Sequence, residues 1–319
     1  MLKVINALFL LVVLLKFNYL QSESSSSFAF ITNQESNKLD IINLKTKTKV
    51  NEIDIGLKPA GISLNKDKGI VFISNPGSNN ISEFTKSNNV IHKIKSGKSP
   101  LGLFYSIDEK LIVSNWYDNQ ITIIDTSNKK IIKEVKVGRS PAGVYLSKNN
   151  KNIFVANRED NNVTVLDSEN FKFIKNIKVE KAPFGVFSND DIDFLVVTNV
   201  QSNSISIINK QTLNVVKTIS VGKWPYYAAF DNYKKKLYVT NQRSDSISVI
   251  DMNSYKKIKT LVDICEYPEG IDISYNENLL VVACWFEDNI ILLDLDSLDE
   301  IKRIQTSGGP RAFGNFILE

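Results

Sequence analysis

The chain repeats itself every 41 to 43 residues, and this period constrains the fold more than any other feature. A proline that follows a turn recurs seven times, at Pro59, Pro100, Pro141, Pro183, Pro225, Pro268 and Pro310. Seven of the eight prolines are therefore in register, and only Pro76 is not. An asparagine recurs with the same period at Asn33, Asn75, Asn115, Asn157, Asn199 and Asn241, with Cys284 in the seventh position.

Each period contains four short segments of alternating apolar and polar residues, separated by polar turns. The period that begins at Val221 is the clearest, with segments at residues 227–230, 236–241, 247–251 and 256–263. Such alternation predicts β-strands. Four strands in a period of this length are typical of a β-propeller, in which each small sheet buries its apolar faces against the neighbouring sheets.

The two ends of the chain determine how the ring closes. The first period lacks its leading strand and begins at residues 28–33, whereas the last has only a leading strand, at residues 312–318. If this last segment becomes the innermost strand of the first sheet, hydrogen bonds between the two ends remove an open edge. We therefore predict an all-β fold, a seven-bladed β-propeller of four-stranded antiparallel blades over residues 28–319, its first blade closed by the C-terminal strand.

The second predicted strand of each period ends in a recurring motif. Residues 237–241 read LYVTN, and residues 197–199, 155–157 and 113–115 are close variants. Together with the G-x-x-P-x-G turns, this pattern resembles the YVTN-repeat β-propeller family of bacterial and archaeal exported and surface proteins. The resemblance covers residues 28–319 and implies a fold rather than a function, because the matching residues build the blade.

The N-terminus predicts export. Residues 1–22 contain a basic residue followed by an apolar run of about 12 residues, which suits a signal peptide and falls short of the roughly 20 that span a bilayer. Residues 23–27 are a serine-rich linker. We expect a periplasmic or extracellular protein with no transmembrane helix in the mature chain, either cleaved near residues 20–23 or retained by an uncleaved anchor.

Several kinds of chemistry are excluded by composition. The one histidine, His92, occupies an outer-strand position, so a histidine cluster, paired haem ligands and a Ser-His-Asp arrangement cannot form. Relatives of this architecture bind haem or act as quinone-linked dehydrogenase subunits, and the ligand histidines of the haem proteins have no counterpart here. We predict no cofactor, no metal and no catalytic residue. The formal charge of +4 includes Lys3 and Lys16 and is too small to argue for nucleic acid by itself.

Carboxylates recur in the loop after the second strand. Either they form a central ring that holds a cation or does acid/base work, or they cap turns through bonds to the backbone. They are Asp118, Glu159, Asp160, Asp245, Glu287 and Asp288.

Both cysteines stand where the repeat is broken. Cys265 replaces the turn glycine seen at Gly97 and Gly222, and Cys284 replaces the strand-end asparagine. These two positions should lie at the same end of neighbouring strands. The pair predicts a disulfide formed in an oxidising compartment, the alternative being two unpaired buried thiols.

Aromatic residues and arginines gather in two kinds of loop that share one face of a propeller, the inter-blade turns and the loops between second and third strands. All three tryptophans and four of the five arginines fall there. Such residues supply most of the energy in recognition sites; alternatively, the aromatics fill gaps between blades. The predicted ligand- or partner-binding residues are Trp116, Tyr117, Arg139, Arg158, Trp224, Tyr226, Tyr227, Arg243, Tyr267, Trp285, Phe286 and Arg311.

Three functions fit these observations. The first is a non-catalytic binding or scaffold propeller, a monomer that recognises a partner protein or a small anionic ligand on this face. The second is a propeller enzyme or accessory subunit, lactonase-like or associated with a quinone-dependent dehydrogenase, which would need carboxylates that converge on the central channel. The third is a protein that stacks single-stranded nucleic acid on its tryptophans.

Overall fold

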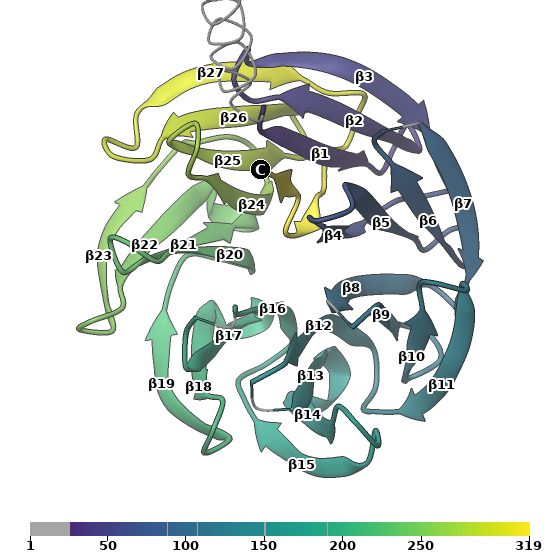
Figure 1. The fold of residues 1–319 in the computed structure, drawn as a ribbon. Helices are drawn as coiled ribbons and strands as arrows, with labels where there is room; N and C mark the ends of the chain where they lie inside the picture. Colours follow the sequence, from purple (N-terminus) through teal and green to yellow (C-terminus); the bar gives the residue numbers. More distant parts are fainter. Residues whose placement is uncertain (1–25, 88, 107, 150, 190) are drawn as a thin grey trace, which may run out of the picture.

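The computed structural model describes residues 26–87, 89–106, 108–149, 151–189 and 191–319. The predicted leader, residues 1–22, lies outside them, as do residues 23–25 of the linker. The described residues form seven sheets around a central axis (Figure 1), each with four antiparallel blade strands, which confirms the predicted seven-bladed propeller. Among these residues, no helix is long and apolar enough to cross a membrane.

The strands of each blade follow one another from the centre outward, except that the last strand of the chain belongs to the first blade. The strands of blades 1 to 3 are β29 (Ile317–Leu318), β1 (Phe28–Asn33), β2 (Lys38–Asn43) and β3 (Thr48–Asp54); β4 (Gly61–Asn65), β5 (Ile70–Asn75), β6 (Asn80–Thr85) and β7 (Val90–Lys95); and β8 (Pro100–Ser106), β9 (Lys110–Asn115), β10 (Gln120–Asp125) and β11 (Lys130–Lys136). The strands of blades 4 and 5 are β12 (Pro141–Ser147), β13 (Asn152–Asn157), β14 (Asn162–Asp167) and β15 (Phe173–Lys178); and β16 (Pro183–Phe187), β17 (Phe194–Asn199), β18 (Ser204–Asn209) and β19 (Asn214–Ser220). The strands of blades 6 and 7 are β20 (Pro225–Asp231), β21 (Lys236–Asn241), β22 (Ser246–Asp251) and β23 (Lys256–Leu261); and β24 (Pro268–Ser274), β25 (Leu279–Cys284), β26 (Asn289–Asp294) and β27 (Glu300–Gln305). Single 3-10 turns follow the second strands of blades 4 to 6, at η1 (Arg158–Asp160), η2 (Val200–Ser202) and η3 (Gln242–Ser244).

Burial falls from the inner strands of a blade to its outer strand, because neighbouring blades cover only the inner ones. All six residues of β25 are buried, whereas no residue of β11 is. His92 is exposed on the outermost strand β7, as its position in the repeat predicts. The apolar residues of the middle strands therefore form the core between blades.

The innermost strands approach one another so closely that glycine is needed on them. The second residue after the repeat proline is glycine in five of the seven repeats, at Gly61, Gly102, Gly143, Gly185 and Gly270. A Cβ atom at any of these positions would lie 1.9–2.6 Å from a backbone carbonyl oxygen of the next repeat. Hydroxyl groups bridge the same junction, as where Ser74 Oγ donates to the Leu101 carbonyl at 2.7 Å. The innermost strands therefore pack backbone against backbone around the central channel.

The strand-end asparagines connect each blade to the inter-blade turn beside it. Asn115 Nδ2 donates to Thr122 Oγ1 on the next strand at 2.7 Å, and its Oδ1 accepts from the Gly97 amide at 3.1 Å. Asn241 Oδ1 accepts from the Gly222 amide in the same way at 3.0 Å. This contact explains why the asparagine and the turn glycine recur together in the sequence.

The C-terminal segment closes the ring in two pieces. Strand β29 pairs antiparallel with β1 and completes blade 1, which confirms the predicted closure. The prediction of one continuous strand over residues 312–318 is wrong, because Phe313–Gly314 (β28) pairs in parallel with β4 of blade 2. Gly314 has a φ of 140°, a conformation that glycine adopts readily and other residues do not, so the chain can turn between the two blades there.

Candidate functional site

The residue that follows each repeat proline changes character around the ring. In blades 2 to 4 it is small or apolar, in blades 5 and 6 aromatic, in blade 7 acidic, and in the closing segment basic. The series is Ala60, Leu101, Ala142, Phe184, Tyr226, Glu269 and Arg311. Six of these residues are buried and Arg311 is half-buried, so the sequence places a charged pair at the centre of the molecule.

The last four residues of this series line a cavity of about 290 Å³, near the lower end of the range for small-molecule sites. Loops on the predicted recognition face supply the rest of its wall. The lining residues are Trp116, Arg158, Phe184, Val200, Trp224, Tyr226, Gln242, Tyr267, Glu269 and Arg311. We call this space the arginine cavity.

An ion pair lies in the wall of the arginine cavity. Arg311 Nε donates to the Tyr226 hydroxyl at 2.7 Å and lies 3.2 Å from Glu269 Oε2. Gln242 Nε2 donates to Glu269 Oε1 at 2.8 Å. In the part of the chain that the structure describes, neither terminal nitrogen of Arg311 forms a hydrogen bond, whereas the Glu269 carboxylate also interacts with the Tyr226 hydroxyl. The pair therefore keeps donor capacity for a ligand at Arg311.

Burial controls the ionisation of this pair. The Glu269 side chain is only 3% exposed, and burial raises the pKa of its carboxyl to about 7, although the charge of Arg311 opposes the shift. Burial alone would lower the pKa of Arg311, but the Glu269 carboxylate and the Tyr226 hydroxyl outweigh it, and the pKa is raised. Arg311 is consequently a permanent cation, while Glu269 changes charge near neutral pH.

Arginines stack on the tryptophans at the edge of the cavity. The Arg243 guanidinium lies 3.5 Å from the centre of the Trp224 ring, and that of Arg158 lies 5.9 Å from the Trp116 ring. Arg158 and Arg243 occupy equivalent 3-10 turns, η1 and η3, each of which ends at a residue in the left-handed conformation. The side chain of that residue in blade 6, Asp245, accepts from the Tyr267 amide at 2.9 Å and so fixes the adjoining turn.

Six of the twelve predicted binding residues meet at the arginine cavity, and Arg243 supports its wall. Four others lie outside it. Tyr117 and Phe286 are strongly exposed, Arg139 pairs with Asp160 at 2.6 Å, and Trp285 packs against Phe286 with ring centres 4.7 Å apart. The six lining residues are Trp116, Arg158, Trp224, Tyr226, Tyr267 and Arg311.

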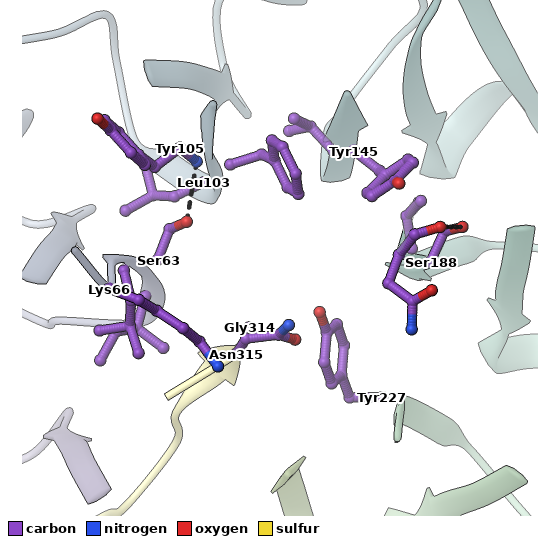
Figure 2. A pocket seen from close by; sticks show the side chains of 15 residues that line it. Ser63, Lys66, Leu103, Tyr105, Tyr145, Ser188, Tyr227, Gly314 and Asn315 are labelled. Atoms are coloured by element: carbon purple, nitrogen blue, oxygen red, sulfur yellow. Dashed lines mark hydrogen bonds between the residues drawn. The ribbon is translucent and has the colours of Figure 1, made fainter. Parts of the chain in front are cut away.

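Tyr227, which was predicted on this face, lines a different cavity at the other end of the channel. Figure 2 shows it among the residues of that cavity. Tyr226 and Tyr227 are neighbouring residues of strand β20, and successive side chains of a strand point in opposite directions.

Five of the six recurring carboxylates are turn caps rather than members of a central ring, and the sixth, Glu159, lies 3.5 Å from Arg158 instead. Asp160 Oδ2 accepts from the Arg139 amide at 2.7 Å, and Asp118 Oδ2 accepts from the Lys98 amide at 2.6 Å. Asp288 Oδ1 accepts from Gly309 at 2.7 Å in the same manner. Glu269, whose carboxylate lines the arginine cavity, was not predicted.

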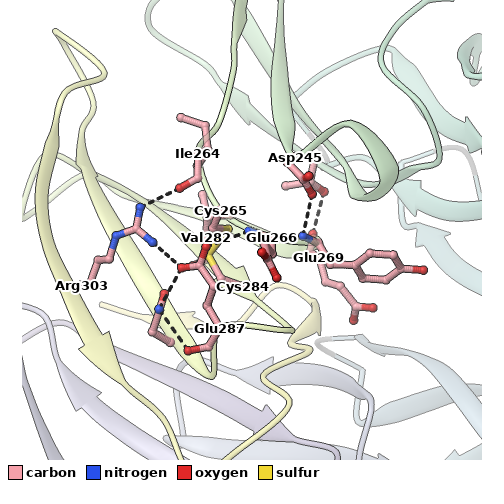
Figure 3. Close-up of a disulfide and its surroundings, with 12 residues drawn as sticks. Asp245, Ile264, Cys265, Glu266, Glu269, Val282, Cys284, Glu287 and Arg303 are labelled. Carbon is pink, nitrogen blue, oxygen red and sulfur yellow. Dashed lines mark hydrogen bonds and ion pairs between the residues drawn. A yellow bond between two sulfur atoms is a disulfide. The ribbon is translucent and has the colours of Figure 1, made fainter.

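Cys265 and Cys284 form a disulfide with their Cα atoms 5.8 Å apart (Figure 3). The turn around it is held by Arg303, which donates to the Ile264 carbonyl at 2.8 Å and pairs with Glu287. The bond replaces the contact between the turn glycine and the strand-end asparagine of the other blades.

Loss of this disulfide should lower the free energy of unfolding by about 3 kcal/mol, because the bond closes a loop across a sequence separation of 19. The measurement is urea unfolding of Cys284→Ser and of the wild type with and without reductant. The matched control is Cys265→Gly/Cys284→Asn, which restores the pair of the other blades and should recover about 1 kcal/mol through a hydrogen bond. An unfolding midpoint of the wild type that does not respond to reductant would contradict the prediction.

The fold and the cavity define a seven-bladed β-propeller with a polar site at one end of its channel. The family model described as "Cytochrome D1 heme domain" matches residues 91–189, less than half of the chain. No curated protein sequence matches the chain.

Solved structures share the fold. A Kuenenia stuttgartiensis hydrazine synthase chain is 19% identical, with 80% of this chain and 88% of that chain covered and a TM-score of 0.72. A functionally unknown protein from Desulfotomaculum acetoxidans is 13% identical over 90% of this chain and 99% of its own, with a TM-score of 0.78. Dihydro-heme d1 dehydrogenase NirN, solved in complex with DHE, is 11% identical over 90% of this chain and 73% of its own, with a TM-score of 0.67. Identities this low show the fold alone.

The donor groups of this chain do not fit a haem held by a protein ligand. His92 is exposed on the outer strand β7, and both cysteines are in the disulfide. Tyr226 is the buried hydroxyl of the arginine cavity, and burial raises its pKa, which disfavours the phenolate that would bind iron. Among the described residues, no group of three or more metal-binding side chains is present.

Proposed function

We propose that this chain is an exported binding propeller that takes a small organic carboxylate in the arginine cavity. The observation that carries the proposal is Arg311. Its Nε is held by Tyr226 and Glu269, and the planar fork at its other end is left for a ligand. Two parallel N–H bonds from an arginine fork match the two oxygens of a carboxylate.

The charge of the lining also favours an anion. Arg158 and Arg311 stand against one carboxylate, Glu269, which is partly protonated at neutral pH because its pKa is about 7. The aromatic walls at Trp116 and Trp224 favour a flat, apolar body behind the carboxylate. An aromatic carboxylate such as benzoate satisfies both requirements.

The alternative functions have less support. A propeller enzyme of the expected kind needs carboxylates that converge on the channel, and Glu269 is the only one lining the cavities at its two ends, as far as the structure describes the chain. Single-stranded nucleic acid needs bases to stack on successive aromatic rings along a groove. Here the two lining tryptophans meet at one cavity instead.

The test is a titration of intrinsic tryptophan fluorescence with benzoate, succinate and inorganic phosphate. Benzoate should give a saturable change, since Trp116 and Trp224 line the cavity. Arg311→Lys keeps the charge but loses the fork, and Arg158→Gln removes a partly exposed cation. Each variant should weaken benzoate binding by about tenfold or more.

Arg139→Gln is the matched control, because this arginine lies on the same face but pairs with Asp160 outside the cavity. It should leave benzoate binding unchanged. The proposal fails if no carboxylate binds the wild type, or if Arg139→Gln weakens binding as much as Arg158→Gln does.

A further inference from the structure

A cluster of aromatic rings divides the central channel into two compartments. The Phe313 ring lies 5.0 Å from Phe184, 5.3 Å from Tyr226 and 5.4 Å from Tyr227, measured between ring centres. Tyr226 lines the arginine cavity on one side, and Tyr227 lines a second cavity of about 370 Å³ on the other. We call this second space the tyrosine cavity.

The walls of the tyrosine cavity are mainly apolar. Equivalent residues of the innermost strands of four successive blades line it, each the third residue after a repeat proline: Ile62, Leu103, Val144 and Val186. The rings of Phe104, Tyr105 and Tyr145 also border it, and Figure 2 shows the two tyrosines. A ligand in this space would therefore bury an apolar body against strands β4, β8, β12 and β16.

Three polar groups gather at one side of the cavity. Figure 2 shows the Tyr227 hydroxyl beside the Asn315 side chain, with Lys66 extending toward the same place. Tyr227 is only 7% exposed, and within the described chain its hydroxyl has no hydrogen bond partner. Within the described residues Lys66 forms no ion pair at contact distance, although its charge opposes the burial that raises the pKa of the Asp272 carboxyl. All three groups therefore keep donors for a ligand.

Tyr227 is a departure from the repeat. The equivalent position is glycine in five other repeats, because a side chain there meets the neighbouring backbone. At this position the chain carries a large side chain that brings a hydroxyl to the cavity. Neither blade packing nor the hydrogen bonds of the described residues use that hydroxyl.

Asn315 is fixed in place by the chain on either side of it. Gly314 pairs with Ile62 in strand β4, and the Asp272 carboxylate accepts from the Phe316 amide at 2.8 Å and the Ile317 amide at 3.0 Å. The other Asp272 oxygen accepts from the Ile273 amide at 2.9 Å. Asp272 therefore bonds to the backbone and is not among the lining residues, although its charge acts on both Tyr227 and Lys66. No residue of the described lining itself carries a negative charge.

We propose that the tyrosine cavity is a second ligand site, for a small amphiphilic carboxylate. The aliphatic body lies against Ile62, Leu103 and Val144, and the carboxylate accepts from Lys66, Tyr227 and Asn315. This site does not depend on the function proposed for the arginine cavity, because the Phe313 cluster separates the two.

The test is isothermal titration calorimetry of the full chain with octanoate and with octan-1-ol, which has the same chain length and no carboxylate. Octanoate should bind one to one, and octan-1-ol should bind about tenfold more weakly or worse. Lys66→Ala and Tyr227→Phe should each weaken octanoate binding by about five- to tenfold. The phenylalanine keeps the ring that packs on Phe313, so the fold is retained.

Two control variants test whether octanoate binding is specific to the tyrosine cavity. Lys148→Ala removes a lysine that borders a neighbouring groove outside the cavity, and Arg158→Gln alters only the arginine cavity. Neither should change octanoate binding. The proposal is overturned if octanoate does not bind, if octan-1-ol binds equally well, or if either control weakens binding as much as Lys66→Ala does.

Discussion

Replacing Arg311 with methionine should lower the free energy of unfolding by about 3 kcal/mol at pH 7.5, and by much less at pH 5. The substitution leaves the Glu269 carboxylate, whose side chain is 3% exposed, without its counter-charge at 3.2 Å. A buried carboxylate without a partner must either stay ionised at high cost or take up a proton. At pH 5 it is protonated in both proteins, so only the lost packing and the lost bond to Tyr226 remain.

The sign of the pH dependence follows from the direction of the Glu269 shift. The folded-state pKa of about 7 lies above the ordinary value of 4.5. The favourable contribution of the protonated carboxyl is complete below about pH 4.5 and is lost as the pH rises to about 7. Over that window it is worth about 3 kcal/mol. Glu269→Gln should remove this pH dependence of the free energy of unfolding, since an amide does not titrate.

Urea unfolding of four proteins at pH 5 and pH 7.5 measures these effects: the wild type, Arg311→Met, Glu269→Gln and the double variant. The double variant should be more stable at pH 7.5 than the sum of the single losses predicts, because it leaves no unpaired charge. An Arg311→Met variant within 1 kcal/mol of the wild type at pH 7.5 would show that Glu269 does not need this partner.

The sequence predicts the blades well because each blade is specified locally. The repeat proline, the strand-end asparagine and the alternating strands act within one period, and seven copies reinforce one another. The disulfide could be predicted for the same reason, since Cys265 and Cys284 replace a glycine and an asparagine that touch in the other blades. When the usual residue at a repeat position makes a known contact, a different residue there can be interpreted as a replacement for that contact.

The centre of the ring was harder to predict because its residues come from different periods. Glu269, which the prediction missed, occupies the position after the repeat proline, the same position that holds Tyr226 and Arg311 in two other repeats. Comparing the residues at this position across the seven repeats would have identified Glu269. No such comparison predicts β28, because it pairs in parallel with β4, a strand of another period, and Gly314 takes a φ of 140° there.

The tight approach of the innermost strands leads to the second large effect, a loss of about 3 kcal/mol or more on Gly61→Ala. The new Cβ would lie 1.9 Å from the Leu101 carbonyl oxygen and 2.8 Å from Ser74 Oγ. Ser74 Oγ accepts from the Gly61 amide and donates to the Leu101 carbonyl, both at 2.7 Å. Relieving the overlap therefore pulls apart the bridge between blades 2 and 3.

Gly69→Ala is the control that separates overlap from backbone strain. Gly69 has a φ of 61°, so alanine there is strained, but no atom lies within 4 Å of its added Cβ. We expect it to cost about 1 kcal/mol in the same urea unfolding measurement. If Gly61→Ala costs no more than Gly69→Ala, the innermost strands can move apart freely. The glycines after the repeat prolines would then not set the width of the channel that holds both cavities.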